Sequence, residues 1–136
     1  MTDREEFIAW TQTRLRDAEE ALHNGDAEPR LALWSSREPV SVLGAWRSAT
    51  GQDEVRGLFR DLAETFAECK SHVYELVSAD VIGDVAFTAG YERTRASVSG
   101  ERRRYVLRVT QVYRREDGEW RVAHRHGDTV EITIEE

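Results

Sequence analysis

Apolar and polar residues alternate through most of the second half of the chain, which is the pattern of β-strands. The alternation predicts four strands, at His72–Ile82, Val85–Val98, Arg102–Arg115 and Trp120–Gly127. The segments between them are short and rich in glycine, aspartate and serine, which are the residues of hairpin turns. We therefore expect a meander of four antiparallel strands.

Apolar residues recur every three to four positions in the first half of the chain, which predicts helices. Thr2 and Glu5 have the spacing of a capping box, and a helix is expected to follow to about His23. A short second helix is expected to end near Trp34. The clearest amphipathic pattern predicts a third helix from about Asp53 to the start of the strands.

The lengths of the predicted turns fix which residues face each other across the strands. Turns of two, two and three residues place Tyr91 opposite Arg108, and Arg108 opposite His126. In the next row, Thr110 is expected to face His124. One face of the sheet would then carry a phenol, a guanidinium and two imidazoles.

We expect the helices to cover this polar face, because the residues predicted on the other face are small and mixed. Charged groups that are buried without partners cost several kcal/mol, so the interface is expected to be a partly wet cleft. Its walls are expected to be aromatic: Trp34, Trp46, Phe59, Phe66 and Tyr91. The other face is expected to be exposed or to form a dimer interface, and His23 and His72 are expected to be exposed.

Composition narrows the class of protein. The 136 residues fit one domain, and the net charge of −7 argues against a general nucleic-acid partner. No apolar run approaches the roughly 20 residues of a membrane span, and the acidic N-terminus does not resemble a signal peptide. The single cysteine, Cys69, excludes an internal disulfide and favours a cytoplasmic location.

A family resemblance follows from these motifs. The segment LRVTQVYRREDGEWRVAHRHGD is similar to the C-terminal pattern of the SnoaL-like branch of the nuclear transport factor 2-like (NTF2-like) superfamily. The segments WSSREPVSVLGAW and GQDEVRGLF resemble that branch as well. The resemblance covers nearly the whole chain, 1–136, as one domain. It implies an α+β cone of the cystatin type, in which three N-terminal helices pack on a curved antiparallel sheet, and usually a homodimer.

The resemblance implies a small-molecule pocket and leaves the activity open. Acid/base isomerisation, cyclisation or dehydration of a carbonyl-bearing compound is one hypothesis, although the Asp, Tyr and Asp trio of the ketosteroid isomerases has no convincing match. A non-catalytic ligand-binding or assembly module is the alternative. The candidate catalytic residues are His126, His124 and Tyr91, and the candidate ligand-binding residues are Arg108, Thr110, Trp34, Trp46, Phe59, Asp80 and Asp128.

The ligand expected in this pocket is an organic anion, held by Arg108, or a hydrophobic carbonyl compound. No cofactor is expected. His124, His126 and Asp128 alternate along one strand and would span ~13 Å, which is too far apart for one metal ion. We therefore expect no metal, and a second copy of the chain as the protein partner.

Overall fold

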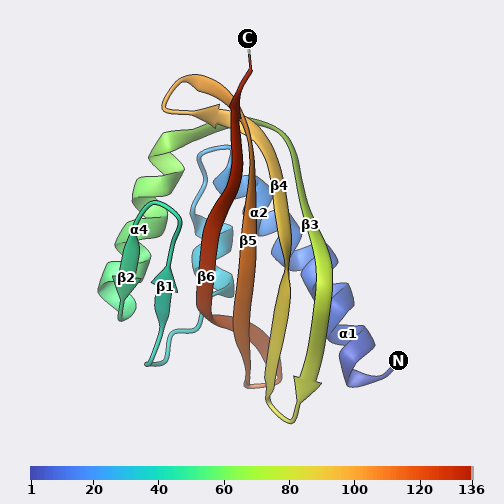
Figure 1. Cartoon of the computed structure of the whole chain (residues 1–136). Coiled ribbons are helices and arrows are strands. Elements are labelled where there is room, and N and C mark those ends of the chain that lie inside the picture. The colour runs from blue at the N-terminus through green and yellow to red at the C-terminus, as the bar shows by residue number, and fades with distance from the viewer. Residues whose placement is uncertain (136) are drawn as a thin grey trace.

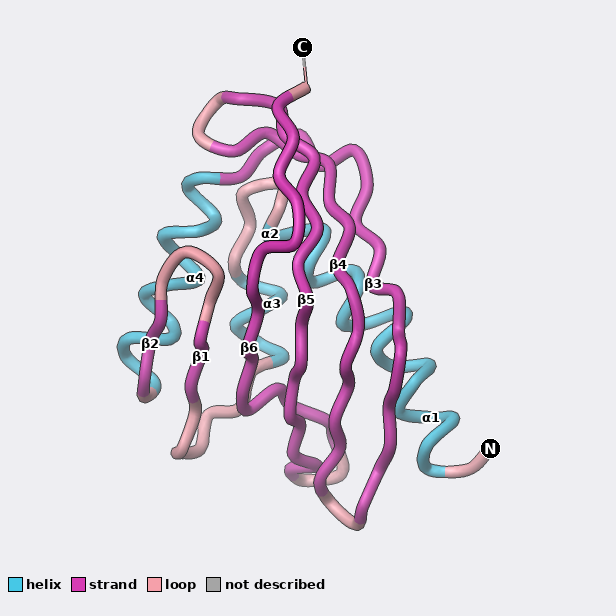
Figure 2. The backbone as a smooth tube through the Cα atoms, viewed as in Figure 1, coloured by secondary structure: helices cyan, strands magenta, loops and turns pink. Residues whose placement is uncertain are grey.

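The sheet of this protein is long, strongly curved and covered by helices on one face (Figures 1 and 2). A computed structural model describes residues 1–135. The helices are α1 (Asp3–Trp10), the π-helical segment η1 (Thr11–Leu15), α2 (Arg16–Leu22), α3 (Glu28–Leu33) and α4 (Gln52–Thr65). The strands are β1 (Ser41–Leu43), β2 (Ser48–Thr50), β3 (Phe66–Ile82), β4 (Val85–Val98), β5 (Glu101–Glu116) and β6 (Glu119–Ile134).

The strands form one sheet in the order β2-β1-β6-β5-β4-β3. The four long strands are antiparallel neighbours in chain order, and β1 joins the edge of the meander parallel to β6. Because α1, η1 and α2 follow one another without a break, they act as one long N-terminal helix. The predicted α+β fold, three helices on a mostly antiparallel sheet, is therefore confirmed.

The second hairpin has the predicted register, with Val98 opposite Glu101, and the first has it near its turn, with Ile82 opposite Val85. A bulge between Leu76 and Ser78 then shifts the pairing of β3 with β4 by one residue, so that Glu75 faces Tyr91.

The third hairpin does not have the predicted register. Its turn contains only Asp117 and Gly118, whose φ values of 52° and 79° are those of a tight two-residue turn. This shift and a bulge farther along β6 change the pairing, as described for the site below.

The apolar core lies between the helices and the inner face of the sheet. Phe7 of α1 is fully buried, and its ring packs edge-on against Tyr113 of β5 and Trp120 of β6. Tyr105 and Leu107 continue this apolar row along β5 and are also buried. Within residues 1–135, no helix has the length and apolar character that crossing a bilayer requires.

The Phe7 contact gives a test of this core. Phe7→Ala removes a ring that is 0% exposed and should lower the free energy of unfolding by about 3–5 kcal/mol. Urea denaturation of both proteins measures the difference. The control is Val77→Ala, because Val77 is 68% exposed and should change stability by less than about 0.5 kcal/mol. Equal effects of the two substitutions would contradict the placement of α1.

Candidate functional site

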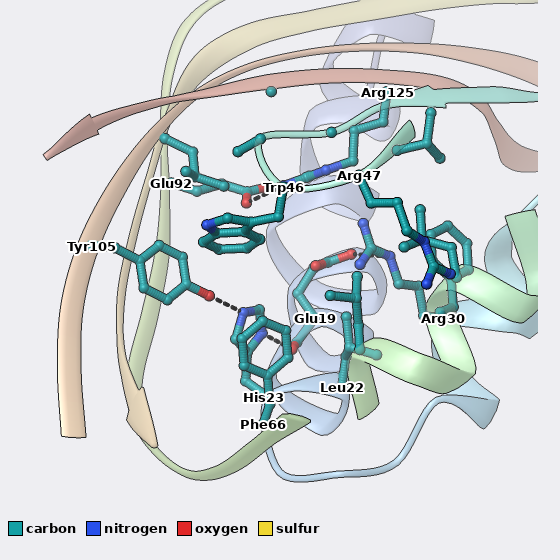
Figure 3. A pocket seen from close by; sticks show the side chains of 18 residues that line it. Glu19, Leu22, His23, Arg30, Trp46, Arg47, Phe66, Glu92, Tyr105 and Arg125 are labelled. Carbon is teal, nitrogen blue, oxygen red and sulfur yellow. Dashed lines mark hydrogen bonds and ion pairs between the residues drawn. The ribbon is translucent and has the colours of Figure 1, made fainter. Parts of the chain in front are cut away.

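A pocket lies between the inner face of the sheet and the helices α2, α3 and α4 (Figure 3). Its empty volume, which includes its open mouth, is about 570 Å³. Eighteen residues line it: Glu19, Leu22, His23, Arg30, Val42, Gly44, Ala45, Trp46, Arg47, Leu58, Phe59, Leu62, Phe66, Glu92, Tyr105, Leu107, Arg125 and Gly127. The lining therefore combines an aromatic and aliphatic wall with a cluster of acidic, basic and hydrogen-bonding groups.

His23 and Tyr105 form a hydrogen-bonded pair in this pocket. The Nδ1 atom of His23 lies 2.7 Å from the backbone carbonyl of Glu19, and its Nε2 atom lies 2.5 Å from the hydroxyl of Tyr105. A carbonyl can only accept, so Nδ1 carries the proton. In a neutral ring Nε2 then has a free lone pair, and the phenol of Tyr105 must donate to it.

Burial decides the charge state of this pair. Burial, and then the neighbouring His72, lowers the pKa of His23 from 6.5 to about 3, so the ring is neutral at pH 7. Burial also raises the pKa of Tyr105 above its usual value, so the phenol keeps its proton. The pair is thus a neutral acid hydrogen-bonded to a neutral base, inside a pocket.

Two buried ion pairs form the polar floor of the pocket. Arg125 donates to both carboxylate oxygens of Glu92 at 2.6 and 2.7 Å, and neither side chain is more than 10% exposed. Burial alone would raise the pKa of Glu92, but the charge of Arg125 and its hydrogen bonds hold it well below the usual range. The second pair joins Arg30 to Glu19 with 3.1 Å between Nε and Oε1, and the guanidinium also lies over the ring of Phe59.

A chain of hydrogen bonds continues from the floor into the core. Arg125 donates to Gln111, whose amide donates at 2.7 Å to the hydroxyl of Tyr113. That hydroxyl lies 2.9 Å from Thr88, and the hydroxyl of Tyr74 donates to Thr88 as well. The buried side chains in this chain of hydrogen bonds therefore each have a partner, which removes much of the cost of burying them.

Trp46 closes the mouth of the pocket. It lies in the loop between β1 and β2, and its ring packs edge-on against Tyr105 with 5.4 Å between the ring centroids. The side chain is nevertheless 49% exposed, so one side of the indole faces solvent and the other faces the pocket. Figure 3 shows Phe66 beside His23, and the ring centroids of Phe66 and Trp46 lie 6.4 Å apart.

One group of side chains has the spacing of metal ligands. Possible donor atoms of Glu19, His72 and Glu92 lie within 4.8 Å of one another, and all three residues are buried. The two carboxylates are already balanced by Arg30 and Arg125. A divalent cation between them would add two uncompensated positive charges to a buried site, which is costly, so we assign no metal there.

Comparison with protein families now identifies the chain. Residues 11–129 match the family model of the SnoaL-like domain. The chain belongs to the SnoaL-like domain family. No functionally curated protein matches the sequence.

Solved structures share this SnoaL-like fold at low sequence identity. A candidate scytalone dehydratase from Novosphingobium aromaticivorans has a TM-score of 0.77 at 20% identity, over 100% of this chain and 93% of its own. A ketosteroid isomerase-like protein from Erwinia carotovora atroseptica has a TM-score of 0.76 at 16% identity, with 96% and 99% covered. A candidate dehydratase of the NTF2-like family from Streptomyces avermitilis has a TM-score of 0.72 at 21% identity, with 93% and 95% covered. These likenesses show the fold.

The SnoaL-like pocket does not contain the polar row predicted from the sequence. Tyr91, Arg108 and His126 do share one face of the sheet, but it is the outer face, away from the helices. Arg108 forms two hydrogen bonds with Asp128, at 3.2 and 2.5 Å, and the two side chains are 61% and 51% exposed. Because of the shortened turn and the bulge, Arg108 faces Asp128 and His126 faces Thr110. The predicted placement of these residues in a helix-covered cleft is therefore wrong.

The other predicted residues are divided between the two faces. His124 is half-buried on the outer face, where its Nδ1 lies 2.8 Å from the hydroxyl of Ser41, and burial lowers its pKa. Asp80 is exposed near the end of β3. Trp46 and Phe59 do line the pocket, as predicted. Trp34 is buried behind Phe59, with 4.8 Å between the ring centroids, and does not line the pocket.

Sequence reasoning missed the two histidines that the structure buries. His23 and His72 were expected to be exposed, but each is only 4% exposed. A signal for His23 was present, because Glu19 and His23 lie four and eight positions after Leu15, on the same helical stripe as Leu22. His72 gave no comparable signal. It is buried because β3 pairs with β4 there and places His72 beside Thr94, which lies 22 residues later in the chain.

The neutral state of His23 predicts a pH dependence of stability. The unfolded chain takes up a proton on His23 near pH 6.5, whereas the folded chain does so only near pH 3. Stability must therefore fall as the pH decreases through this interval, by up to about 1.4 kcal/mol per pH unit. Between pH 6 and pH 5, the wild type should lose roughly 1 kcal/mol more than His23→Gln in urea denaturation. Equal losses would show that His23 is not held neutral.

Proposed function

We propose that this SnoaL-like protein binds a small carbonyl-bearing molecule in the inner pocket and acts on it by acid/base chemistry, as an isomerase, cyclase or dehydratase does. The observation that supports this proposal is the neutral His23 ring hydrogen-bonded to Tyr105 within a pocket that also holds the Glu19 carboxylate. The names of the isomerase-like and dehydratase neighbours agree with this class of reaction.

The Tyr105 and His23 pair can move a proton without a charged resting state. When a bound molecule gives a proton to the oxygen of Tyr105, the phenol passes its own proton to Nε2 of His23. The resulting imidazolium keeps its hydrogen bond from Nδ1–H to the carbonyl of Glu19. The low pKa of His23 makes this imidazolium a strong acid, which returns the proton by the same path.

Glu19 supplies the second acid/base group. Glu19 lines the pocket, and its carboxylate lies beside the guanidinium of Arg30, with 3.1 Å between Oε1 and Nε. An ionised carboxylate with a free lone pair can take a proton from a carbon next to a carbonyl.

Substitutions on the two faces of the sheet test this proposal. Screening by thermal shift with steroid-like, polyketide-like and carboxylate compounds identifies ligands, and turnover is then followed for those that bind. Tyr105→Phe keeps the ring but removes the hydroxyl group that transfers the proton, and it should lower turnover by roughly a hundredfold or more. Glu19→Gln should lower turnover similarly.

The outer-face variants Arg108→Ala and His126→Ala serve as controls, because both side chains are exposed on the other side of the sheet. They should leave binding and turnover unchanged. If these variants lost turnover and Tyr105→Phe did not, the result would indicate that the active site lies on the outer face of the sheet. Binding without turnover in any variant would favour the alternative, a ligand-binding or accessory module.

We also propose that two copies of the chain pair through the outer face of the sheet. Phe87 and Val112 face each other there across β4 and β5, and both are only half-buried in a single chain. Apolar side chains on an uncovered sheet face are typical of an association surface. The cytoplasmic location expected from the single cysteine remains a prediction.

The proposed dimer predicts that a charged side chain placed in its interface will separate the two chains. The wild type should elute with about twice the 15.6 kDa mass of one chain in size-exclusion chromatography with light scattering. Val112→Glu should shift it to a monomer, because a buried unpaired carboxylate opposes association. Val130→Glu, at an exposed position far along β6, should remain a dimer. A monomeric wild type would refute the pairing.

A further inference from the structure

The loop between β1 and β2 places a third arginine at the mouth of the pocket. Of the residues that the structure describes, three arginines and two glutamates line the pocket. Arg30 is buried and paired with Glu19. Arg125 is likewise buried and paired with Glu92. Arg47 remains outside this balance, and its side chain is 50% exposed. The pocket wall therefore has one positive charge that neither glutamate balances and that a molecule from solvent can reach.

A tight turn holds Arg47 in this position. The backbone N–H of Gly44 donates to the carbonyl of Arg47 at 3.1 Å, between the paired ends of β1 and β2. Any side chain at position 44 would disturb this turn, because a Cβ atom there would lie 2.3 Å from the same carbonyl oxygen. Figure 3 shows Arg47 and Tyr105 on opposite sides of the pocket, with Trp46 between them. The turn thus places a cation across the pocket from the phenol that hydrogen-bonds to His23.

Arg47 has an acidic partner, but that partner lies outside the pocket. Its Nη1 atom lies 2.9 Å from Oδ2 of Asp61 on α4, and the Asp61 side chain is 61% exposed. An ion pair between exposed side chains contributes little to stability, because water solvates both charges well when they separate. A carboxylate in the pocket mouth can therefore take the place of Asp61 at low cost.

We infer that the pocket takes a carbonyl-bearing aromatic molecule with a separate anionic group, a carboxylate or its equivalent, which Arg47 binds in place of Asp61. A carboxylate can accept two N–H groups of one guanidinium, which makes this contact both strong and directional. The rings of Trp46, Phe66 and Tyr105 line the same pocket, which suits a flat aromatic molecule.

This inference rests on the proposed function for the place of the reacting carbonyl, beside Tyr105. It adds the second group by which the molecule is held. The organic anion that the sequence placed at Arg108 is here assigned to Arg47, on the other face of the sheet.

Three probes of the same shape and different charge test the inference on the unaltered protein. The probes para-acetylbenzoate, para-acetylbenzamide and para-acetylbenzamidine share a ring and a ketone, and their other ends are anionic, neutral and cationic. Each is titrated separately, and binding is followed by the backbone amide shifts of Leu22, Trp46 and Leu107 in NMR spectra. The benzoate should bind at least about tenfold more tightly than the other two, because only its carboxylate pairs with Arg47. Equal or tighter binding of the benzamide or the benzamidine would overturn the inference.

Arg47→Gln identifies the group that recognises the anion. The substitution removes the guanidinium at an exposed position, so the preference for the benzoate over the benzamide should fall below about threefold. The matched control is Arg37→Gln, because Arg37 forms a similarly exposed ion pair with Asp117, away from the pocket. It changes the net charge by the same amount and should keep the preference of the wild type. An undiminished preference in Arg47→Gln would overturn the inference.

A substitution of Asp61 should have the opposite effect. In Asp61→Asn the carboxylate that competes for Arg47 is gone, so the benzoate should bind about two- to fivefold more tightly than it binds to the wild type. The control is Asp117→Asn, which makes the same change of charge beside Arg37 and should leave the affinity unchanged. An equal gain in both variants would be a general effect of net charge and would contradict the role of Arg47.

The outcomes separate this inference from the proposed function. If all three probes shift the pocket amides at similar concentrations, the pocket binds carbonyl compounds and only the anionic group is wrong. If none of them shifts these amides at millimolar concentration, the inference and the proposed pocket are both contradicted. If the benzoate shifts only amides elsewhere in the chain, the inference is contradicted as well.

Discussion

The buried ion pair between Glu92 and Arg125 determines which face of the sheet the helices can cover. Both oxygens of Glu92 accept from Arg125, and the remaining polar groups on this face hydrogen-bond in turn through Gln111 to Tyr113. A charged group left without its partner on this face would cost several kcal/mol. Because the pairs are complete, the helices can pack over a sheet that carries two ionised side chains.

The same ion pairs also determine the polarity of the pocket floor. The paired charges form a floor that is polar but neutral overall, and the aromatic side chains form the wall and the mouth. Between them, His23 is held neutral by burial and accepts a hydrogen bond from the hydroxyl of Tyr105. The pocket therefore holds acid/base groups whose protonation states are set by their surroundings, which is typical of sites that carry out chemistry.

The sequence predicted the elements of this fold well, because its helices and hairpins depend on local patterns. The amphipathic stripe of α4 and the turn residues after Ile82 and Val98 led to the correct elements and to the correct register beside each of these two turns. The third register was missed because Glu116, Asp117 and Gly118 suit both a two-residue and a three-residue turn.

The covered face was predicted wrongly for a different physical reason. Alternation shows which residues share a face, but it does not show which face is buried. The inner face carries Glu92, Gln111 and Arg125, which appear to be surface residues when each is taken alone. Glu92 and Arg125 are 33 residues apart in the chain, so their pairing is visible only in three dimensions. The apolar row of Tyr105, Leu107 and Tyr113 on the same face was the sequence signal that should have received more weight.

A double-mutant cycle on Glu92 and Arg125 tests this account most directly. The free energy of unfolding is measured by urea denaturation for the wild type, Glu92→Gln, Arg125→Met and the double variant. The account predicts that each single substitution lowers stability by about 3–5 kcal/mol, and that the double variant loses much less than the sum, because no unpaired charge remains. Small and additive effects would contradict it, because they would mean that the two side chains are exposed and that the helices cover the other face.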